Sequence, residues 1–271
     1  MALLELNDGS GARLHYEVRD GLVPENILFI HGNLASNAWW KPAEPFWAAS
    51  SRGTDPGALV YGEFRGCGGS SDPRSAADVD MHLFARDFIQ LVRHLNRGRF
   101  HLVGHSTGGL IAALMMAMEP SLFDRAVLVD PVGARGVRFD DSMIGAFERM
   151  KSDRGMTAAV LGATIHGHDP ASDFFQKFVV EDAQRAVKAV GHWVLRALDG
   201  LDARAEMAKI TSPVLVLHGE HDQLLPVEDS RELASLIPQG RFEMLAGQGH
   251  CPNIENPESF VAVTRQFLMT R

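Results

Sequence analysis

The sequence predicts an α/β fold in which a mostly parallel β-sheet carries helices on both faces. Short, almost entirely apolar segments, such as 26–33 and 99–106, are typical of strands that are buried on both faces of a sheet. Longer segments between them, such as 80–96, repeat apolar residues at helical spacing. Because strands that alternate with helices form right-handed βαβ units, this order predicts parallel strands flanked by helices.

The predicted elements follow one another regularly along most of the chain. Residues 3–20 hold two short strands around a Gly/Asp turn and predict a β-hairpin. Segment 57–73 reads as a strand that ends in a glycine-rich loop, and Asp80 or Asp78 is placed to cap the helix that follows. The later strands are expected within 99–106, 124–131, 212–222 and 241–247, and the later helices within 107–120, 226–238 and 256–268.

The alternation of strands and helices stops between residues 133 and 205. This segment shows helical patterns at 140–151, 172–179 and 181–201 and no convincing strand. It leaves the core just after the carboxyl end of a strand, where ligands bind in open α/β sheets, and this position favours a lid over remote packing helices. We therefore expect a core of residues 1–132 and 206–271 and a helical cap of residues 133–205.

Composition excludes several classes of partner. A formal net charge of −8 and a pI near 5.8 argue against nucleic-acid and anionic-membrane partners and leave a small molecule as the expected ligand. The first twenty residues carry charges and glycines where a signal peptide needs an apolar core, so we expect a cytoplasmic protein. Cys67 and Cys251 alone make no disulfide framework, and the oligomeric state stays open.

Ser106 lies in the sequence Gly104-His105-Ser106-Thr107-Gly108, between a predicted strand and a predicted helix. This placement matches the G-x-S-x-G turn that presents a serine nucleophile at a strained strand–helix junction. The flanking glycines leave room for the strand and helix to cross closely. Because Thr107 begins the helix, its amide is free to stabilise developing negative charge. We therefore predict Ser106 as a nucleophile and Thr107 as an oxyanion donor.

A serine nucleophile needs a base that accepts its proton. His250 is the best candidate, because it lies in a glycine-bounded loop after the last predicted strand. Three other histidines lie at strand ends and could enter the same region; each is more typical of a structural histidine: His31, His105 and His218.

The base in turn needs a carboxylate that fixes its tautomer and stabilises the imidazolium. Asp222 follows a core strand and precedes a proline-bounded loop, and this turn chemistry favours it over Asp130, which ends the preceding core strand. The order Ser106, Asp222, His250 is the Ser…Asp…His order of a catalytic triad known from one fold family.

The loop after the strand at 26–33 is expected to supply a second oxyanion donor. The amide of Asn33 is our choice, with Leu34 as the near alternative. Trp39 and Trp40 are expected to help line the pocket, although core packing of one of them fits the sequence equally well.

Five segments in order resemble the α/β-hydrolase superfamily, in its branch with an HG oxyanion loop and a helical cap. They are FIHGN, FRGCGGSSDP, VGHSTGG, VLHGEHDQLLP and GHCPNIENPESF, and they cover nearly the whole core. The resemblance implies an eight-stranded, mostly parallel sheet and a Ser106–His250–Asp222 triad that needs no metal or cofactor. The chain departs from the family at Glu63, where an aspartate is usual, and this departure concerns loop geometry rather than chemistry.

The HGN segment with downstream tryptophans is also similar to the haloalkane dehalogenases, which use an aspartate nucleophile. In this chain the equivalent position is Ser106. Displacement of a halide by a serine leaves an alkyl ether, which has no carbonyl for water to attack. Dehalogenation is therefore excluded by the chemistry of the nucleophile.

The function that we expect is a serine hydrolase that cleaves a small, hydrophobic ester or lactone through an acyl-serine intermediate. Hydrolysis of a carbon–carbon bond in a β-diketone-like ring-fission product is the alternative, and cofactor-free perhydrolysis is another. A non-catalytic ligand receptor on the same fold is less favoured.

Substrate contacts are expected from the cap. Its cations could hold a substrate carboxylate, although helical spacing favours solvent exposure for most of them: Arg135, Arg138, Arg149, Lys177, Arg185, Lys188 and Arg196. Its apolar residues form either a substrate-facing underside or the core of the cap itself: Met143, Ile144, Phe147, Met150, Met156, Leu161, Phe174, Phe175, Phe178, Trp193 and Leu195.

Overall fold

The computed structural model describes residues 2–51 and 54–270, and within them a single eight-stranded sheet has the order β1-β2-β4-β3-β5-β6-β7-β8. The β1/β2 and β2/β4 pairs are antiparallel and the remaining pairs are parallel. The strands are β1 Ala2–Glu5, β2 Arg13–Asp20, β3 Asn26–Ile30, β4 Ala58–Gly62, β5 Phe100–His105, β6 Phe123–Val129, β7 Val214–Gly219 and β8 Gly240–Leu245. The predicted hairpin and mostly parallel sheet are confirmed.

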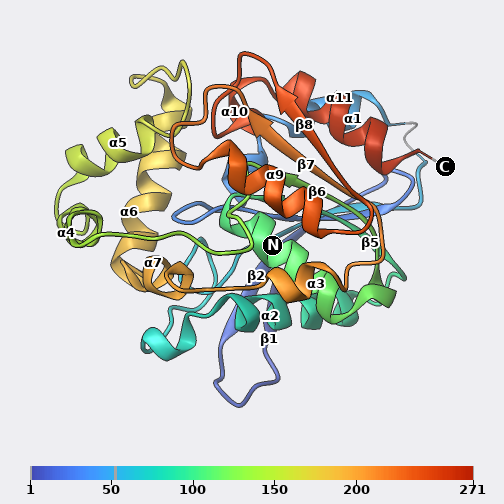
Figure 1. Cartoon of the computed structure of the whole chain (residues 1–271), viewed down its shortest axis with the longest axis horizontal. Helices are drawn as coiled ribbons and strands as arrows, with labels where there is room; N and C mark the ends of the chain where they lie inside the picture. The colour runs from blue at the N-terminus through green and yellow to red at the C-terminus, as the bar shows by residue number, and fades with distance from the viewer. Residues whose placement is uncertain (1, 52–53, 271) are drawn as a thin grey trace.

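Helices cover both faces of this sheet (Figure 1). The core helices are α1 Glu44–Ala49, α2 Met81–Leu95, α3 Thr107–Met118, α8 Arg204–Met207, α9 Val227–Leu236, α10 Pro252–Glu255 and α11 Pro257–Leu268. Short turns of 3₁₀-helix are η1 Asn37–Trp40, η2 Ala76–Asp78 and η3 Pro120–Leu122. Of the two candidate caps for α2, Asp80 is the residue used, since its side chain accepts a hydrogen bond from the Leu83 amide.

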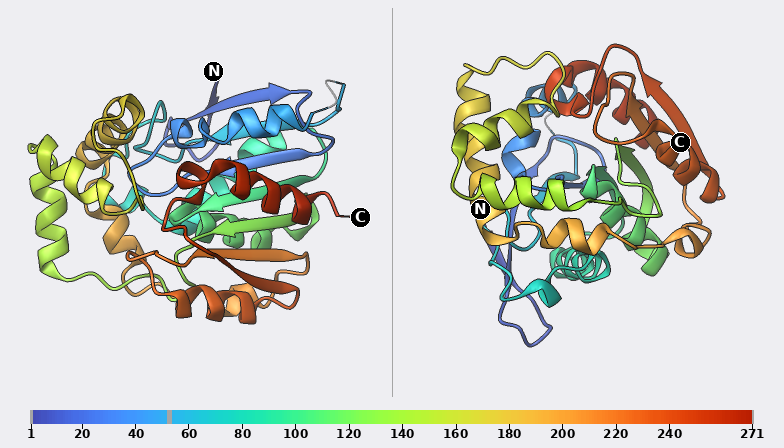
Figure 2. Two further views of the ribbon diagram at one scale, coloured as in Figure 1. Left: turned by 90° about the horizontal axis from the view of Figure 1, so that it is seen from above. Right: turned by 60° about the vertical axis from the view of Figure 1, so that its left-hand side comes forward.

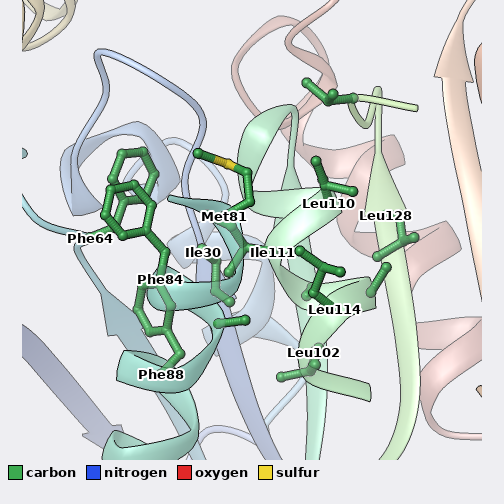
Figure 3. Packing of buried hydrophobic residues seen from close by; sticks show 14 of the residues in the cluster. Ile30, Phe64, Met81, Phe84, Phe88, Leu102, Leu110, Ile111, Leu114 and Leu128 are labelled. Atoms are coloured by element: carbon green, nitrogen blue, oxygen red, sulfur yellow. The ribbon is translucent and has the colours of Figure 1, made fainter. Parts of the chain in front are cut away.

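Alternate strand residues divide the apolar core into two layers. Ile27 and Phe29 of β3 join the layer under α1 and α11, whereas Leu28 and Ile30 face α2 and α3. This division follows from the two-residue period of a strand, which sends successive side chains to opposite faces. Figure 3 shows the layer on the α2 and α3 side, where aromatic and aliphatic side chains interlock: Ile30, Phe64, Met81, Phe84, Phe88, Leu102, Leu110, Ile111, Leu114 and Leu128.

The segment between β6 and β7 is helical in its middle part, and the left panel of Figure 2 shows these yellow-green to gold helices at one end of the sheet. We call residues 133–205 the cap. Its helices are α4 Asp141–Met150, α5 Arg154–Gly162, the π-helix η4 Phe175–Val179, α6 Val180–Ala189 and α7 Trp193–Leu198. The sequence patterns did not indicate α5, and the helix expected over 181–201 is divided at Gly191, whose φ is +49°.

Two further observations concern membrane-spanning helices and the two cysteines. Within the described residues, no helix is both long enough and apolar enough to cross a membrane. Cys67 and Cys251 are buried free thiols and do not form a disulfide with each other.

Candidate active site at the carboxyl edge of the sheet

The predicted site residues gather at one edge of the sheet because they follow the carboxyl ends of neighbouring parallel strands. Asn33 follows β3, Ser106 follows β5, Asp222 follows β7 and His250 follows β8. Parallel strands end at a common edge, so loops that are far apart in sequence meet there. The cap lies over the same edge and supplies further walls of the site.

Ser106 occupies a strained backbone conformation at the junction of β5 and α3. Its φ and ψ are +54° and −121°, a region that a residue with a side chain rarely adopts. A Cβ on Gly104 would lie 2.3 Å from the Gly108 carbonyl oxygen, and one on Gly108 would lie 2.3 Å from the Ile30 carbonyl oxygen. The two glycines therefore allow a crossing that side chains would block, and the turn exposes Ser106 to the cavity.

His250 and Asp222 form a hydrogen-bonded pair beside Ser106. The His250 Nδ1 atom lies 2.8 Å from Asp222 Oδ2. Asp222 Oδ1 accepts hydrogen bonds from the amides of Leu224, at 2.7 Å, and Leu225, at 3.2 Å. Burial opposes ionisation of Asp222, but the hydrogen bond and charge of His250 and these two amides outweigh it and lower the pKa of the carboxyl. Asp222 is therefore ionised at neutral pH, as an acceptor for His250 must be.

His250 and Ser106 line the same cavity, and no hydrogen bond between their side chains occurs in this structure. The side chain of His105 connects their loops, because its Nε2 lies 2.8 Å from the carbonyl oxygen of His250. Burial lowers the pKa of His105 to about 3, so its ring is neutral and its Nε2–H group donates a hydrogen bond to that carbonyl.

The other candidate bases have structural partners. His31 Nδ1 contacts the Gly32 carbonyl oxygen at 2.7 Å, and His218 Nδ1 contacts Ser230 Oγ at 2.9 Å. Burial lowers the pKa of both imidazoles. Of the four histidines considered, His250 alone combines a carboxylate at hydrogen-bonding distance with a place in the cavity wall.

Asp130, the competitor of Asp222, is completely buried close to the His250–Asp222 pair. Its Oδ1 accepts the Gly219 amide at 2.8 Å, and its Oδ2 makes no hydrogen bond. Burial and the neighbouring Asp222 raise the pKa of the Asp130 carboxyl well above its usual range, so Asp130 holds a proton more readily than Asp222 does. A metal held by these three side chains would have to displace the His250–Asp222 hydrogen bond.

Glu255 is a site residue that sequence reasoning missed. Its carboxylate accepts hydrogen bonds from the amides on either side of His250, those of Gly249 and Cys251. It also accepts the amide of His166 in the cap, at 2.9 Å. One carboxylate thus braces the His250 loop and joins it to the cap. The feature of the sequence that could have pointed to Glu255 is its position five residues after His250.

Asn33 and Thr107 line the cavity together with Ser106, and their backbone amides have no acceptor among the described residues. The amide of Leu34 instead donates to Asn33 Oδ1 at 3.0 Å. Leu34 therefore has an internal acceptor, and the side chain of Asn33 is used within its own loop. This arrangement favours Asn33 over Leu34 as the second oxyanion donor.

Glu63, the departure from the family pattern, anchors the loop that follows β3 and the glycine-rich loop that follows β4. Its carboxylate accepts the Asn37 amide at 2.9 Å and the Gly69 amide at 2.6 Å, and it lies 2.7 Å from His15 Nδ1. Burial opposes its ionisation, but these partners lower the pKa of the carboxyl. The glutamate thus holds the loop in place with several hydrogen bonds.

A cavity of about 390 Å³ opens at Ser106 and is bounded by both the core and the cap. Its walls are mostly apolar, as in pockets that bind a hydrophobic small molecule. The core supplies Gly32, Asn33, Leu34, Trp39, His105, Ser106, Thr107, Val132, Leu224, Leu225, Pro226 and His250. The cap supplies Val137, Arg138, Phe139, Met143, Phe147, Val160, Leu161, Thr164, Leu195 and Leu198.

The expectation that Trp40 lines the pocket is wrong, whereas Leu34 and Trp39 do line it. Trp40 packs on the other face of the sheet, 5.2 Å from Phe29 and 6.2 Å from Phe260 between ring centroids. Both tryptophans belong to η1, and a 3₁₀-helix turns by about 120° per residue, so consecutive side chains point in different directions.

The apolar residues of the cap divide between the two roles that the sequence left open. Met143, Phe147, Leu161 and Leu195 line the cavity. Met150 and Phe175 are instead buried in the hydrophobic core. The apolar residues of the cap therefore serve both roles, and Leu161 belongs to both the cavity wall and the buried cluster.

Comparisons with known proteins place the chain in a family. A family model described as the alpha/beta hydrolase fold matches residues 25–257. A protein of Agrobacterium fabrum named "Putative carbamate hydrolase RutD" is 29% identical over 269 residues, which cover 94% of this chain and 98% of that protein.

Solved structures show the same fold over nearly the whole chain. An esterase from Exiguobacterium antarcticum matches with a TM-score of 0.84 at 20% identity and covers 99% of each chain. An enol-lactonase from Burkholderia xenovorans matches with a TM-score of 0.82 at 22% identity, covering 99% of this chain and 100% of the other. Since the family model spans most of the sequence and the sheet has the corresponding topology, the chain belongs to the α/β-hydrolase fold family.

Proposed function

We propose that the protein is a serine hydrolase that cleaves a small, hydrophobic carboxylic ester or lactone through an acyl-serine intermediate. One observation carries this proposal: Ser106, His250 and the unpaired amides of Asn33 and Thr107 meet at an apolar cavity of about 390 Å³. A nucleophile, a base with its own carboxylate and two amide donors are the groups that acyl transfer requires.

In the first half of the proposed reaction, Ser106 Oγ bonds to the substrate carbonyl carbon while His250 Nε2 takes the hydroxyl proton. Asp222 stabilises the resulting imidazolium through Nδ1. The amides of Asn33 and Thr107 hold the oxyanion, and loss of one such donor typically costs about 3–4 kcal/mol of transition-state stabilisation. The tetrahedral intermediate then expels the alcohol, which leaves with the proton from His250.

In the second half, water attacks the acyl-serine carbonyl and gives a proton to His250. The intermediate collapses, the carboxylic acid leaves, and the proton returns to Ser106. We assign the cap the role of a lid, because its side chains complete the walls of the cavity.

Names of the relatives support hydrolysis of a carbonyl group and introduce a second candidate substrate. The relative from Agrobacterium fabrum is named for a carbamate, and the structural neighbours are named as an esterase and an enol-lactonase. A carbamate ester presents an acyl carbonyl to the same nucleophile and oxyanion donors. Esters, lactones and carbamates therefore belong in one substrate panel, beside carbon–carbon hydrolysis and perhydrolysis substrates.

The test is steady-state hydrolysis of p-nitrophenyl butyrate without added metal or cofactor. We expect Ser106→Ala to lower kcat by at least about 10³-fold. Ser121→Ala is the matched control, because Ser121 is exposed and lies outside the cavity. Unchanged turnover in Ser106→Ala would show that Ser106 is not the nucleophile. A wild-type protein that turns over no member of the panel but binds one tightly is a receptor.

A further inference from the structure

The cavity beside Ser106 has one permanently charged residue in its wall. Arg138 lines it together with its neighbours Val137 and Phe139, and no acidic residue does so among the described residues. Apart from the neutral His105 and the proposed base His250, the remaining lining is apolar or uncharged. The guanidinium of Arg138 is therefore the group in this wall that would favour an anionic ligand over a neutral ligand of equal size.

Arg138 is exposed and has no ion pair or hydrogen bond to any described residue, whereas three other cations of the cap have acidic partners. Arg135 binds Glu232 at 2.6 Å, Lys177 binds Asp173 at 2.9 Å and Arg185 binds Asp72 at 3.1 Å. The nearby Asp140 is occupied as the N-cap of α4, where it accepts the Ser142 hydroxyl and the Met143 amide.

The backbone holds Arg138 against the cavity. One residue earlier, the Val137 amide donates to the Leu198 carbonyl at the end of α7, at 3.2 Å. Gly136 makes this approach possible, because a Cβ there would lie 2.0 Å from the same carbonyl oxygen. The segment that carries Arg138 is therefore attached to a second wall of the cavity, Leu198 itself being a lining residue.

We propose that Arg138 binds a carboxylate of the substrate, at the end remote from the carbonyl that Ser106 attacks. The substrate class is then an ester or lactone with an apolar body and one anionic end. A guanidinium pairs with a carboxylate through two parallel hydrogen bonds. The protein carries a formal net charge of −8, so an anionic substrate needs such a local cation to enter. This inference rests on the proposed function.

The test compares two esters of one length, monomethyl suberate and dimethyl suberate, by titration of the acid released. In Arg138→Met, which keeps an apolar stem, we expect kcat/KM for the monoanionic ester to fall about 5- to 20-fold through KM. The neutral diester should change less than twofold, and Arg138→Lys should recover part of the loss. Arg135→Met is the matched control, and it should leave both substrates unaffected.

A binding measurement separates this inference from the proposed function. Calorimetry of monomethyl suberate with Ser106→Ala, with and without Arg138→Met, needs no turnover. Weaker binding in the double variant, with equal thermal stability, supports the carboxylate site even if neither ester is hydrolysed. Equal affinity in the two proteins, an absence of binding to Ser106→Ala, or equal losses on both esters would overturn it.

Discussion

At the scale of single residues, two buried aspartates lie close together, and their surroundings shift the pKa values of their carboxyls in opposite directions. Asp222 receives two amide hydrogen bonds and the His250 ring. Asp130 receives one amide hydrogen bond and has an Oδ2 atom without a partner. Two buried carboxyl groups that lie close together do not both ionise readily, because their negative charges repel each other. The carboxyl group with more hydrogen-bond donors therefore carries the charge.

Replacing each aspartate by asparagine should separate their roles. We expect Asp222→Asn to lower kcat on the order of 10⁴-fold, because the amide no longer fixes the productive tautomer of His250. Asp130→Asn should keep kcat within a few-fold, because a protonated carboxyl and an amide have similar shape and hydrogen-bonding capacity. Both variants are compared in p-nitrophenyl butyrate hydrolysis across pH 5–9. A larger loss in Asp130→Asn than in Asp222→Asn would identify Asp130 as the partner of the base.

At the scale of elements, the β5–Ser106–α3 turn is set by close backbone contacts rather than by side chains. A Cβ at Gly104 would lie 2.3 Å from the Gly108 carbonyl oxygen and 2.7 Å from the Gly109 Cα. Both obstacles are backbone atoms, which cannot rotate away. By contrast, the nearest atom to a Cβ at Gly145, inside α4, is Arg149 Nη1 at 3.8 Å.

Alanine at these two glycines should therefore have opposite effects on the free energy of unfolding. Gly104→Ala should destabilise the protein by about 2–4 kcal/mol, since the strand and helix must separate. Gly145→Ala should stabilise it by about 0.5–1 kcal/mol, since alanine restricts the unfolded chain and favours a helix. Urea denaturation followed by circular dichroism measures both. A neutral Gly104→Ala would mean that the crossing can relax.

At the scale of the whole molecule, the cap and the core share one hydrophobic cluster, and polar contacts join them at its edge. Asp182 of α6 accepts the hydroxyl hydrogen of Ser36, which caps η1 in the loop that follows β3. Burial raises the pKa of Asp182 to about 6, against the opposing effect of the Ser36 hydrogen bond. We therefore expect the contact between the cap and the core to weaken as Asp182 ionises.

The sign of this coupling follows from the raised pKa. Between pH 4 and 6 the folded state binds more protons than the unfolded chain. The contribution of Asp182 to the free energy of unfolding is therefore complete below pH 4 and is lost as the pH rises through 6. Asp182→Asn should remove the dependence and exceed the wild type in stability at pH 7.5 by about 1–3 kcal/mol. Urea denaturation at pH 4, 5.5 and 7.5 measures the difference, which should vanish at pH 4.

The exposed residue Asp173, also in the cap and paired with Lys177, provides the control for this experiment. Asp173→Asn should change stability by less than about 0.5 kcal/mol at each pH. A difference between wild type and Asp182→Asn that is equal at all three pH values would show that Asp182 does not titrate in this range.

The fold class and the family were predictable from the sequence because local sequence patterns determine them. The alternating elements, the G-x-S-x-G turn at Ser106 and the order of Asp222 and His250 are local patterns, and they predicted the fold class and its family, both confirmed. Their assignment as a catalytic triad stays a prediction, and the geometry of the His250–Asp222 pair agrees with it.

Tertiary structure decided which side chains face the cavity. Only packing separates Trp39 from Trp40, frees the amide of Asn33 while occupying that of Leu34, and leaves Arg138 unpaired in the wall of the cavity. Each of these outcomes depends on which long-range neighbours a residue meets, and the neighbours come from strands and helices far away in the chain. Local sequence patterns indicate whether a residue belongs to an apolar face or to a turn. The burial of a side chain, its hydrogen-bond partners and its protonation state depend on the tertiary structure.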